Sequence, residues 1–204
     1  MARPKIHDAG LRLHLLELAA ATVHAHGVES LSLRQLAADA GTSTSAVYTL
    51  FGGREQLLEA VVLEGFASFT AAQNAVAGGF DGDLAPAGRT AAELAALGRE
   101  YRNWALAHPV LFSLMFSGAL NAYLVSEQTL ACAADGLSPL LAAVRRGQES
   151  GALRAEPAEV VATQLWGMVH GLTTLELAGM GPDDMDWAGV YESSLEAAVR
   201  GWMP

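Results

Sequence analysis

Small hydroxyl side chains and one phenol gather near residue 45 of the chain. Thr44 and Tyr48 are four residues apart, as are Ser45 and Thr49, so in a helix these four side chains lie on one face. Groups of this kind can hydrogen-bond to base edges and phosphate oxygens in the major groove of DNA. The spacing therefore predicts a short helix whose outward face contacts DNA.

The segment that positions these side chains, residues 31–51, is expected to form two short helices joined by a tight turn. The first spans residues 33–40, and Gly41 ends it because glycine tolerates the left-handed conformation of such a turn. Ser43 is placed to cap the second helix, because its hydroxyl can accept a free backbone N–H. The inward-facing side chains are Leu36, Ala37, Ala40, Val47 and Phe51. Together these features predict a helix-turn-helix, although two packed helices of an ordinary bundle would show the same spacing.

Alanine and leucine dominate the 204 residues, and β-branched runs are scarce, which favours helices throughout. We predict an all-α fold, with a three-helix N-terminal head containing the helix-turn-helix and a helical bundle after it. The head takes residues 1–53 and the bundle takes residues 54–204. Outside the helix-turn-helix, we expect helices near residues 8–26, from 54 onward, and near 90–107, 126–150, 157–178 and 187–202, with a densely apolar run at 110–116.

The net charge of −10 is unfavourable for a nucleic-acid binder, but the charge is unevenly distributed. Residues 1–56 balance Arg3, Lys5, Arg12, Arg34 and Arg54 against Asp8, Glu17, Glu29, Asp39 and Glu55. The whole negative excess therefore lies after residue 56. A neutral head on an acidic body suits a protein that presents one end to DNA.

Membrane and secretory classes are not expected. No stretch approaches the roughly 18–20 unbroken apolar residues of a membrane span, and residues 1–10 lack the apolar core of a secretion signal. The single cysteine, Cys132, excludes an internal disulfide and fits a reducing cytoplasm. We expect a cytoplasmic protein with no membrane partner.

Catalysis is not expected either. The six histidines are His7, His14, His24, His26, His108 and His170. None of them pairs with another ligand residue in a recognisable metal motif, and neither a glycine-rich phosphate loop nor a nucleophile elbow is present. We therefore expect no catalytic residue, no metal and no cofactor.

The last two helices carry more apolar surface than one chain easily covers. An apolar seam on the first of them repeats at helical spacing, which indicates packing along another helix. Pairing both helices with a second copy would form a two-fold four-helix bundle; the alternative is that they cap the chain's own core. The predicted interface residues are Val161, Leu165, Met168, Leu172, Leu175, Trp187, Tyr191, Leu195, Ala198 and Trp202.

About a third of the chain resembles a known family. The text AATVHAHGVESLSLRQLAADAGTSTSAVYTLFGGREQLLEAV resembles the DNA-binding domain of the TetR family of bacterial transcriptional repressors. Farther on, WGMVHGL resembles the family variant named for a Trp-His-Gly signature. The resemblance implies a repressor that binds a palindromic operator on double-stranded DNA as a homodimer and is released by a small apolar ligand in its C-terminal domain.

The resemblance assigns roles to particular residues of the head. Groove-facing positions fall on Thr44, Ser45 and Ala46, and Ser43 joins this set as the helix cap. Phosphate-contacting positions fall on Ser32, Tyr48, Thr49 and Arg54, and Arg34 stands where a base or the backbone can be reached. Arg3 and Lys5, in an N-terminal arm, are expected to lie along the DNA backbone or in the minor groove.

Two departures from the family's pattern reduce the positive charge of the head. Leu50 stands where the family often has histidine, and Gly52 and Gly53 stand where lysines often flank the turn. Fewer phosphates would be neutralised, and each lost contact lowers the slope of log affinity against log salt by about 0.9. We therefore expect modest non-specific affinity and a shallow salt dependence.

The resemblance also implies a pocket for a small-molecule effector in residues 54–204. Its predicted lining is aromatic and thioether-rich, as ligand cavities often are, although ordinary core packing would explain each residue equally well. These residues are Tyr101, Trp104, Phe112, Met115, Phe116, Trp166 and His170. A histidine on an apolar face needs a hydrogen-bond partner, either a ligand or a backbone carbonyl.

One alternative function stays open at this point. A helical ligand-binding or adaptor protein whose DNA-binding head has degenerated would also show a cation-poor recognition segment and an acidic total charge.

Overall fold

The computed structural model describes residues 6–79, 84–116 and 126–204 of the chain. The predicted N-terminal arm, with Arg3 and Lys5, lies outside the described residues. All regular structure in the described residues is helical, and no strand occurs among them, which confirms the all-α prediction.

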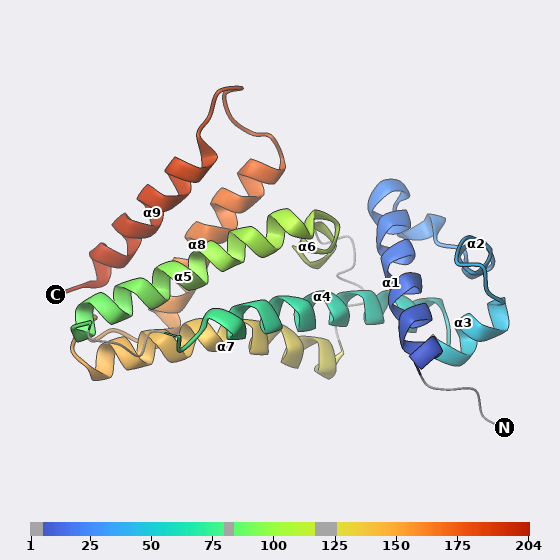
Figure 1. Ribbon diagram of the computed structural model, residues 1–204, viewed down its shortest axis with the longest axis horizontal. Helices are drawn as coiled ribbons and strands as arrows, with labels where there is room; N and C mark the ends of the chain where they lie inside the picture. The colour runs from blue at the N-terminus through green and yellow to red at the C-terminus, as the bar shows by residue number, and fades with distance from the viewer. Residues whose placement is uncertain (1–5, 80–83, 117–125) are drawn as a thin grey trace. The chain divides into compact units, whose positions relative to one another are not determined.

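The helices follow one another along the chain (Figure 1). They are α1 (Ile6–His26), the 3₁₀ turn η1 (Val28–Ser30), α2 (Leu33–Asp39), α3 (Thr44–Phe51), α4 (Arg54–Val76), α5 (Pro86–Ala107), α6 (Pro109–Phe116), α7 (Glu127–Glu149), α8 (Ala158–Leu177) and α9 (Trp187–Trp202). None of these helices is both long enough and apolar enough to cross a membrane, for the part of the chain that is described.

The chain divides into two compact units, and α4 and α7 each run from one unit into the other. The first unit comprises Met1–Ala67 and Pro109–Cys132, and the second comprises Ser68–His108 and Ala133–Pro204. The boundary predicted at residues 53 and 54 coincides with the start of α4, whereas the two units divide farther along that helix.

In the first unit, α1, α2 and α3 pack around a small apolar core. Leu15 and Val47 are fully buried, and Leu36, Ala37 and Phe51 are nearly so. α1 contacts α2, α3 and α6, so it forms the centre of the unit. The three-helix head is therefore present, with α6 packed on it as an additional helix.

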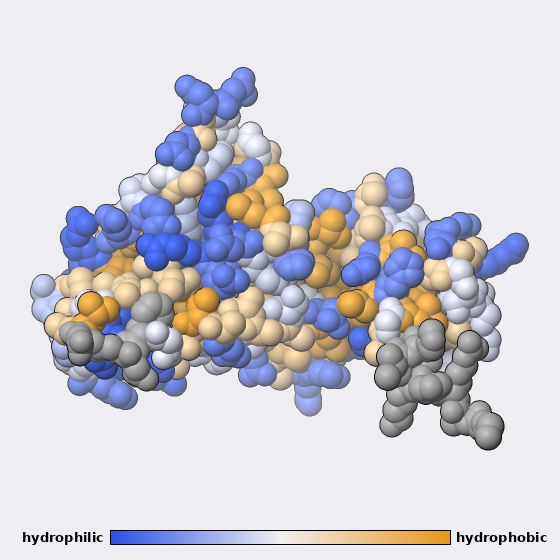
Figure 2. All heavy atoms as spheres, in the orientation of Figure 1, coloured by the Kyte–Doolittle hydropathy of each residue, from blue (hydrophilic) through white to orange (hydrophobic). Residues whose placement is uncertain are grey.

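The second unit is held by a core between α5, α7, α8 and α9. Its buried members are Leu94, Leu97, Ala143, Val144, Leu153, Ala158, Val161, Ala162, Leu165 and Val199. Two bidentate ion pairs join the helices around this core. Arg102 of α5 binds Glu176 of α8 at 2.6 and 2.7 Å. Arg99 of α5 binds Glu192 of α9 at 2.7 and 2.8 Å. The turn between α8 and α9, which includes the exposed Asp183 and Asp184, forms a hydrophilic tip (Figure 2).

Candidate functional site

The turn between α2 and α3 has the geometry that its sequence predicts. Gly41 has a φ of 64°, in the left-handed region that favours glycine. The Ser43 hydroxyl accepts the backbone N–H of Ala46 at 3.1 Å, so the predicted N-cap of α3 is confirmed. The Ser32 hydroxyl caps α2 in the same way, accepting the N–H of Gln35.

α3 turns its polar face to solvent. Ser45, Tyr48 and Thr49 are exposed, with 54% of Tyr48 accessible, while Val47 on the opposite face is fully buried. Thr44 is half-buried at the start of the helix, as is Ala46. Val47 and Phe51 pack into the core on the inner side of α3. This packing fixes the rotation of α3 about its own axis, so that its polar face points to solvent.

The hydroxyls on this surface differ in what they can still donate. Thr49 already donates to the carbonyl of Ser45 at 2.9 Å, so toward DNA it can act as an acceptor. The oxygens of Ser32 and Ser43 accept backbone N–H groups, which leaves each O–H able to donate to a phosphate oxygen. Helix-capping serines can therefore serve the fold and DNA contacts at the same time.

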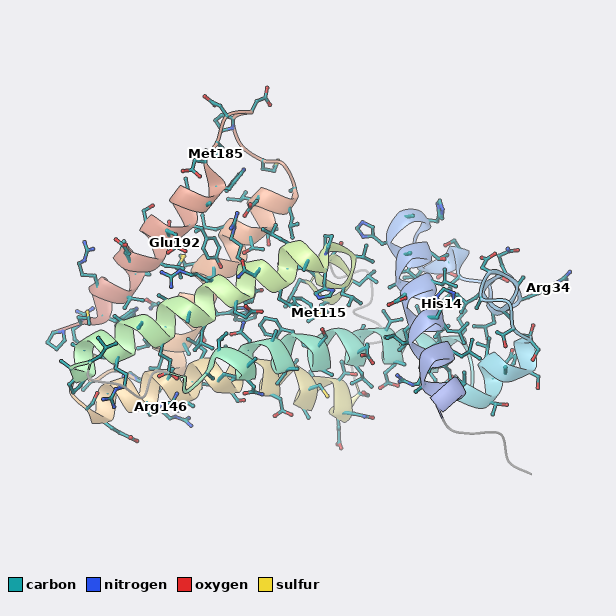
Figure 3. All side chains as sticks on the ribbon, in the orientation of Figure 1. His14, Arg34, Met115, Arg146, Met185 and Glu192 are labelled. Atoms are coloured by element: carbon teal, nitrogen blue, oxygen red, sulfur yellow. The ribbon has the colours of Figure 1, made fainter. Side chains whose placement is uncertain are left out.

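Arg34 is an exposed cation beside this surface. It lies on α2, is exposed, and points outward in Figure 3. No ion pair of its guanidinium is found among the described residues.

Arg54 is turned toward its own chain, whereas the sequence suggested a phosphate contact. Its Nε donates to the carbonyl of Leu31 at 3.1 Å, and its Nη2 donates to the carbonyl of Val28 at 2.5 Å. Nη2 also lies 3.6 Å from a carboxylate oxygen of Glu29. These partners engage Nε and Nη2 and hold the guanidinium against the start of the helix-turn-helix.

Arg12 is a further internal cation of the head. It is 3.5 Å from the Glu64 carboxylate, and its guanidinium carbon lies 5.5 Å from the centroid of the Phe51 ring. It thereby links α1 to α4 and to the end of α3. The positive charge available to DNA is consequently smaller than the arginine count suggests.

In the second unit, four of the predicted pocket residues come together. Tyr101 and Trp104 of α5 are 4% exposed, and Trp166 and His170 of α8 are half-buried. The Tyr101 phenol lies 2.8 Å from Nδ1 of His170, and the Trp166 and His170 rings are 5.9 Å apart. A tyrosine side chain from another helix is thus a hydrogen-bond partner of His170, whereas the sequence suggested a ligand or a backbone carbonyl.

Ser68 and Phe69 of α4 complete this aromatic cluster, although neither was among the predicted lining residues. The Trp104 indole donates to the Ser68 hydroxyl at 3.1 Å, and the Phe69 ring meets both Tyr101 and Trp104 edge-on at 5.3 Å. A buried indole N–H needs an acceptor, so a buried Trp104 by itself predicts a hydrogen-bond partner. That prediction does not identify which of many hydroxyls supplies it.

The direction of the hydrogen bonds in the cluster follows from its chemistry. Burial raises the pKa of Tyr101, and a hydrogen bond from Trp166 opposes that rise. An indole can only donate, so the phenol oxygen accepts from Trp166, and the phenol donates to Nδ1 of His170 in the tautomer that carries its proton on Nε2. Burial lowers the pKa of His170, which agrees with a neutral imidazole that accepts at Nδ1.

The three remaining predicted pocket residues lie in the first unit. Phe112 and Phe116 of α6 have ring centroids 5.1 Å apart, and Phe116 meets Phe66 of α4 at 6.4 Å. Met115 is 4% exposed and lies against Gly65, where a Cβ would approach its sulfur to 2.7 Å. These side chains pack α6 onto α4 within the unit.

The predicted dimer interface requires a correction on both helices. Val161 is fully buried and Leu165 is 6% exposed, while Tyr191 and Leu195 are 2% and 3% exposed. They face the chain's own core and cannot touch a second chain. Ala198 and Trp202 also pack partly against that core, and Trp187 is half-buried.

The outer face of α8 is the stripe next to those buried positions, and it is open to solvent. Met168 and Leu172 are half-buried there, and Leu175 is 43% exposed. Gly167 and Gly171 stand between them, and a Cβ at either position would meet nothing within 4 Å. Val160 and Gln164 extend this exposed face toward the start of the helix.

A metal-ligand cluster of three or more histidine, cysteine or carboxylate side chains is not found in the described part of the chain. His14 lies 3.9 Å from Glu17, and His170 is engaged with Tyr101 as described.

Two family models match the chain. The one described as bacterial regulatory proteins, tetR family, matches residues 15–61, and the one described as tetracyclin repressor-like, C-terminal domain, matches residues 94–200. No curated protein matches the sequence.

Solved structures share the fold over nearly the whole length. A protein of unknown function from Rhodococcus sp. RHA1 is 30% identical, with a TM-score of 0.79 over 95% of this chain and 96% of that one. The TetR family transcriptional regulator PfmR from Thermus thermophilus is 23% identical, with a TM-score of 0.65 over 91% and 97%. A TetR family transcription regulator from Marinobacter aquaeolei VT8 is 21% identical, with a TM-score of 0.75 over 98% and 99%.

Proposed function

Because the chain belongs to the TetR family of bacterial regulatory proteins, we propose that it is a homodimeric repressor that a small apolar ligand releases from a palindromic operator. Membership of the family makes the chain a DNA-binding transcription regulator with a C-terminal ligand-binding domain. The proposal adds three points: the chain represses transcription, its operator is palindromic, and its ligand is small and apolar.

The observation that carries the proposal is the outer face of α3. An exposed phenol and small hydroxyls stand on a recognition helix that Ser43 caps and that Val47 anchors to the core. We assign Thr44, Ser45 and Ala46 to base edges, and Ser32, Tyr48 and Thr49 to phosphates, with Arg34 at the edge of the surface. Two such helices related by two-fold symmetry would read half-sites about 34 Å apart.

A gel shift on the DNA upstream of the chain's own gene, at two salt concentrations, tests the proposal. Tyr48→Ala should weaken binding to all sequences alike, because phosphate contacts carry no sequence information. Thr44→Ala should relax preference at one base pair in each half-site, by roughly 1–3 kcal/mol if the contact is direct. Wild-type binding no tighter to that DNA than to unrelated duplex would contradict the proposal.

A helical adaptor with a degenerate DNA-binding head is the second candidate. It is favoured by the internal pairing of Arg12 and Arg54, which leaves few cations for phosphates. The same gel shift separates the two functions, because an adaptor would bind neither specific nor unrelated duplex.

For dimerisation we propose the outer face of α8, with Met168, Leu172 and Leu175 as apolar contacts and Gly167 and Gly171 allowing close approach. On α9, Trp187 and the exposed edges of Ala198 and Trp202 belong to the same interface. Small residues let helices approach closely, and paired α8 and α9 helices would form a four-helix bundle with two-fold symmetry.

For the effector we propose the aromatic cluster of the second unit around Tyr101, Trp104, Trp166 and His170. Apolar walls with a few polar tips suit a largely apolar ligand. Such a ligand releases DNA only if it binds the DNA-free conformation better than the DNA-bound one. Calorimetric titration with the operator present and absent would measure that difference directly.

A further inference from the structure

Arg54 lies where the chain enters and leaves the helix-turn-helix. The entry is residues 28–32, which form η1 and the Ser32 cap of α2, and the exit is the Gly52-Gly53 turn that follows α3. Arg54 is the first residue of α4 and reaches back across the head to the entry. One guanidinium therefore connects both ends of the motif.

The contacts at the entry hold the backbone in two places. Nε donates to the Leu31 carbonyl at 3.1 Å and Nη2 to the Val28 carbonyl at 2.5 Å. Leu31 is itself 4% exposed, and the next residue is the cap Ser32, whose hydroxyl accepts from Gln35. Fixing the Leu31 carbonyl thus fixes the first turn of α2.

At the exit, the connection is short and constrained. Gly52 has a φ of 90° and donates its N–H to the carbonyl of Tyr48, so α3 ends in a tight turn that Arg54 follows after one further residue. A displacement of the first turn of α4 is consequently passed both to the end of α3 and, through the guanidinium, to the start of α2.

We propose that Arg54 is a positioning residue that clamps the two ends of the helix-turn-helix together and does not contact DNA phosphates. The proposal rests on the proposed DNA-binding role of the head. It makes α2 and α3 move as one body with the start of α4, so that a shift of α4 displaces the whole reading surface.

The fork geometry of arginine separates this role from a phosphate contact. Two carbonyls are held from two different nitrogens of a planar group, which a lysine ammonium cannot reproduce, although lysine binds a phosphate well as a point charge. Arg54→Lys therefore preserves a phosphate contact and breaks the clamp, whereas Arg54→Gln removes both.

The first test measures affinity for a mixed-sequence duplex about three helical turns long as a function of salt. Arg54→Gln and Arg54→Lys should both weaken binding about five- to tenfold at every salt concentration, the effect of one lost hydrogen-bonded partner, with an unchanged salt slope. Arg34→Gln, the matched control with the same charge change on an exposed arginine, should lower the slope by about 0.9.

Either of two outcomes of this titration overturns the proposal. One is a slope lowered by about 0.9 in Arg54→Gln together with wild-type affinity in Arg54→Lys, which is the behaviour of a phosphate contact. The other is unchanged affinity in both variants.

The second test is independent of DNA and keeps the clamp distinguishable from the proposed function. Amide hydrogen exchange in Arg54→Gln should be faster in residues 28–36 and 48–53, and unchanged in α8 and α9, while Arg34→Gln leaves both regions unchanged. Exchange that is unaltered or raised evenly throughout overturns the clamp. If the wild type binds no duplex, the proposed function fails and this measurement alone decides the role of Arg54.

Discussion

His170 keeps its imidazole neutral among aromatic side chains. Nδ1 faces the Tyr101 phenol at 2.8 Å, and burial lowers the pKa of the ring from its ordinary value of 6.5. The unfolded chain therefore takes up a proton on this residue at a higher pH than the folded chain does. The contribution of His170 to stability is complete above its unfolded pKa and is lost as the pH falls below it.

A substitution that cannot be protonated tests this assignment. When the pH is lowered from about 7.5 to about 5.5, the free energy of unfolding should fall less in His170→Gln than in the wild type. Glutamine can accept a hydrogen bond from the Tyr101 hydroxyl but does not titrate. Urea unfolding at the two pH values measures the difference. A loss in His170→Gln equal to that of the wild type would contradict the assignment.

Side-chain types were readable from the sequence, but partners were not. Ser43 was correctly expected to cap α3, because a cap binds an N–H three residues away. For Arg54 the sequence suggested a phosphate contact. Its two carbonyl partners, 23 and 26 residues earlier, were not predicted because nothing in the local pattern points to them. His170 likewise finds its partner 69 residues away.

Among the helices, the contact between α5 and α9 depends on a glycine. A Cβ on Gly98 would overlap the Leu195 side chain, and the Gly98 carbonyl accepts the hydroxyl of the buried Tyr191 at 2.9 Å. The absence of a side chain thus lets the two helices approach closely enough for that hydrogen bond.

Gly98→Ala should therefore lower the free energy of unfolding by about 1–3 kcal/mol, the usual cost of overpacking a core. Gly10→Ala on α1 is the matched control: a Cβ there meets nothing within 4 Å, and alanine favours a helix over glycine by up to about 1 kcal/mol. Chemical denaturation of both variants measures the pair. Equal effects of the two substitutions would show that close packing at Gly98 contributes nothing.

The outer face of α8 makes a separate prediction. Leu175→Glu should raise the dimer dissociation constant by about 100-fold or more, because two-fold symmetry brings two buried carboxylates into one interface. Leu130→Glu on α7, where the leucine is 60% exposed, is the control. Analytical ultracentrifugation over a concentration series gives both constants, and an unchanged constant in Leu175→Glu would remove this face from the proposed interface.

Helix positions were predictable to within a few residues because their signals are local. Gly41 ends α2 where the sequence indicated, and the Gly52-Gly53 pair, Gly151 and the His108-Pro109 step likewise stand where helices end or meet. The orientation of α8 was not predictable, because adjacent stripes of the same helix are both apolar. Val161 and Leu165 turned out to face the core, and only packing against α5 and α9 distinguishes the two stripes.

Across the whole molecule, charge is divided between the two ends of the sequence. The acidic excess lies after residue 56, and the hydrophilic tip between α8 and α9 carries part of it. From residue 6 onward, the head exposes hydroxyls, a phenol and Arg34, while Arg12 and Arg54 contact other residues of the chain. Recognition by such a head relies on neutral hydrogen bonds more than on counterion release, so its affinity for DNA should depend weakly on salt.

The central claim is that two copies of this head read DNA at a fixed spacing. Hydroxyl-radical footprinting of the purified chain on the DNA upstream of its own gene measures that spacing at single-nucleotide resolution. We expect two protected half-sites related by a dyad, with centres about 34 Å apart, and loss of both together in Leu175→Glu. A single protected half-site, or protection no greater than on unrelated DNA, would contradict it.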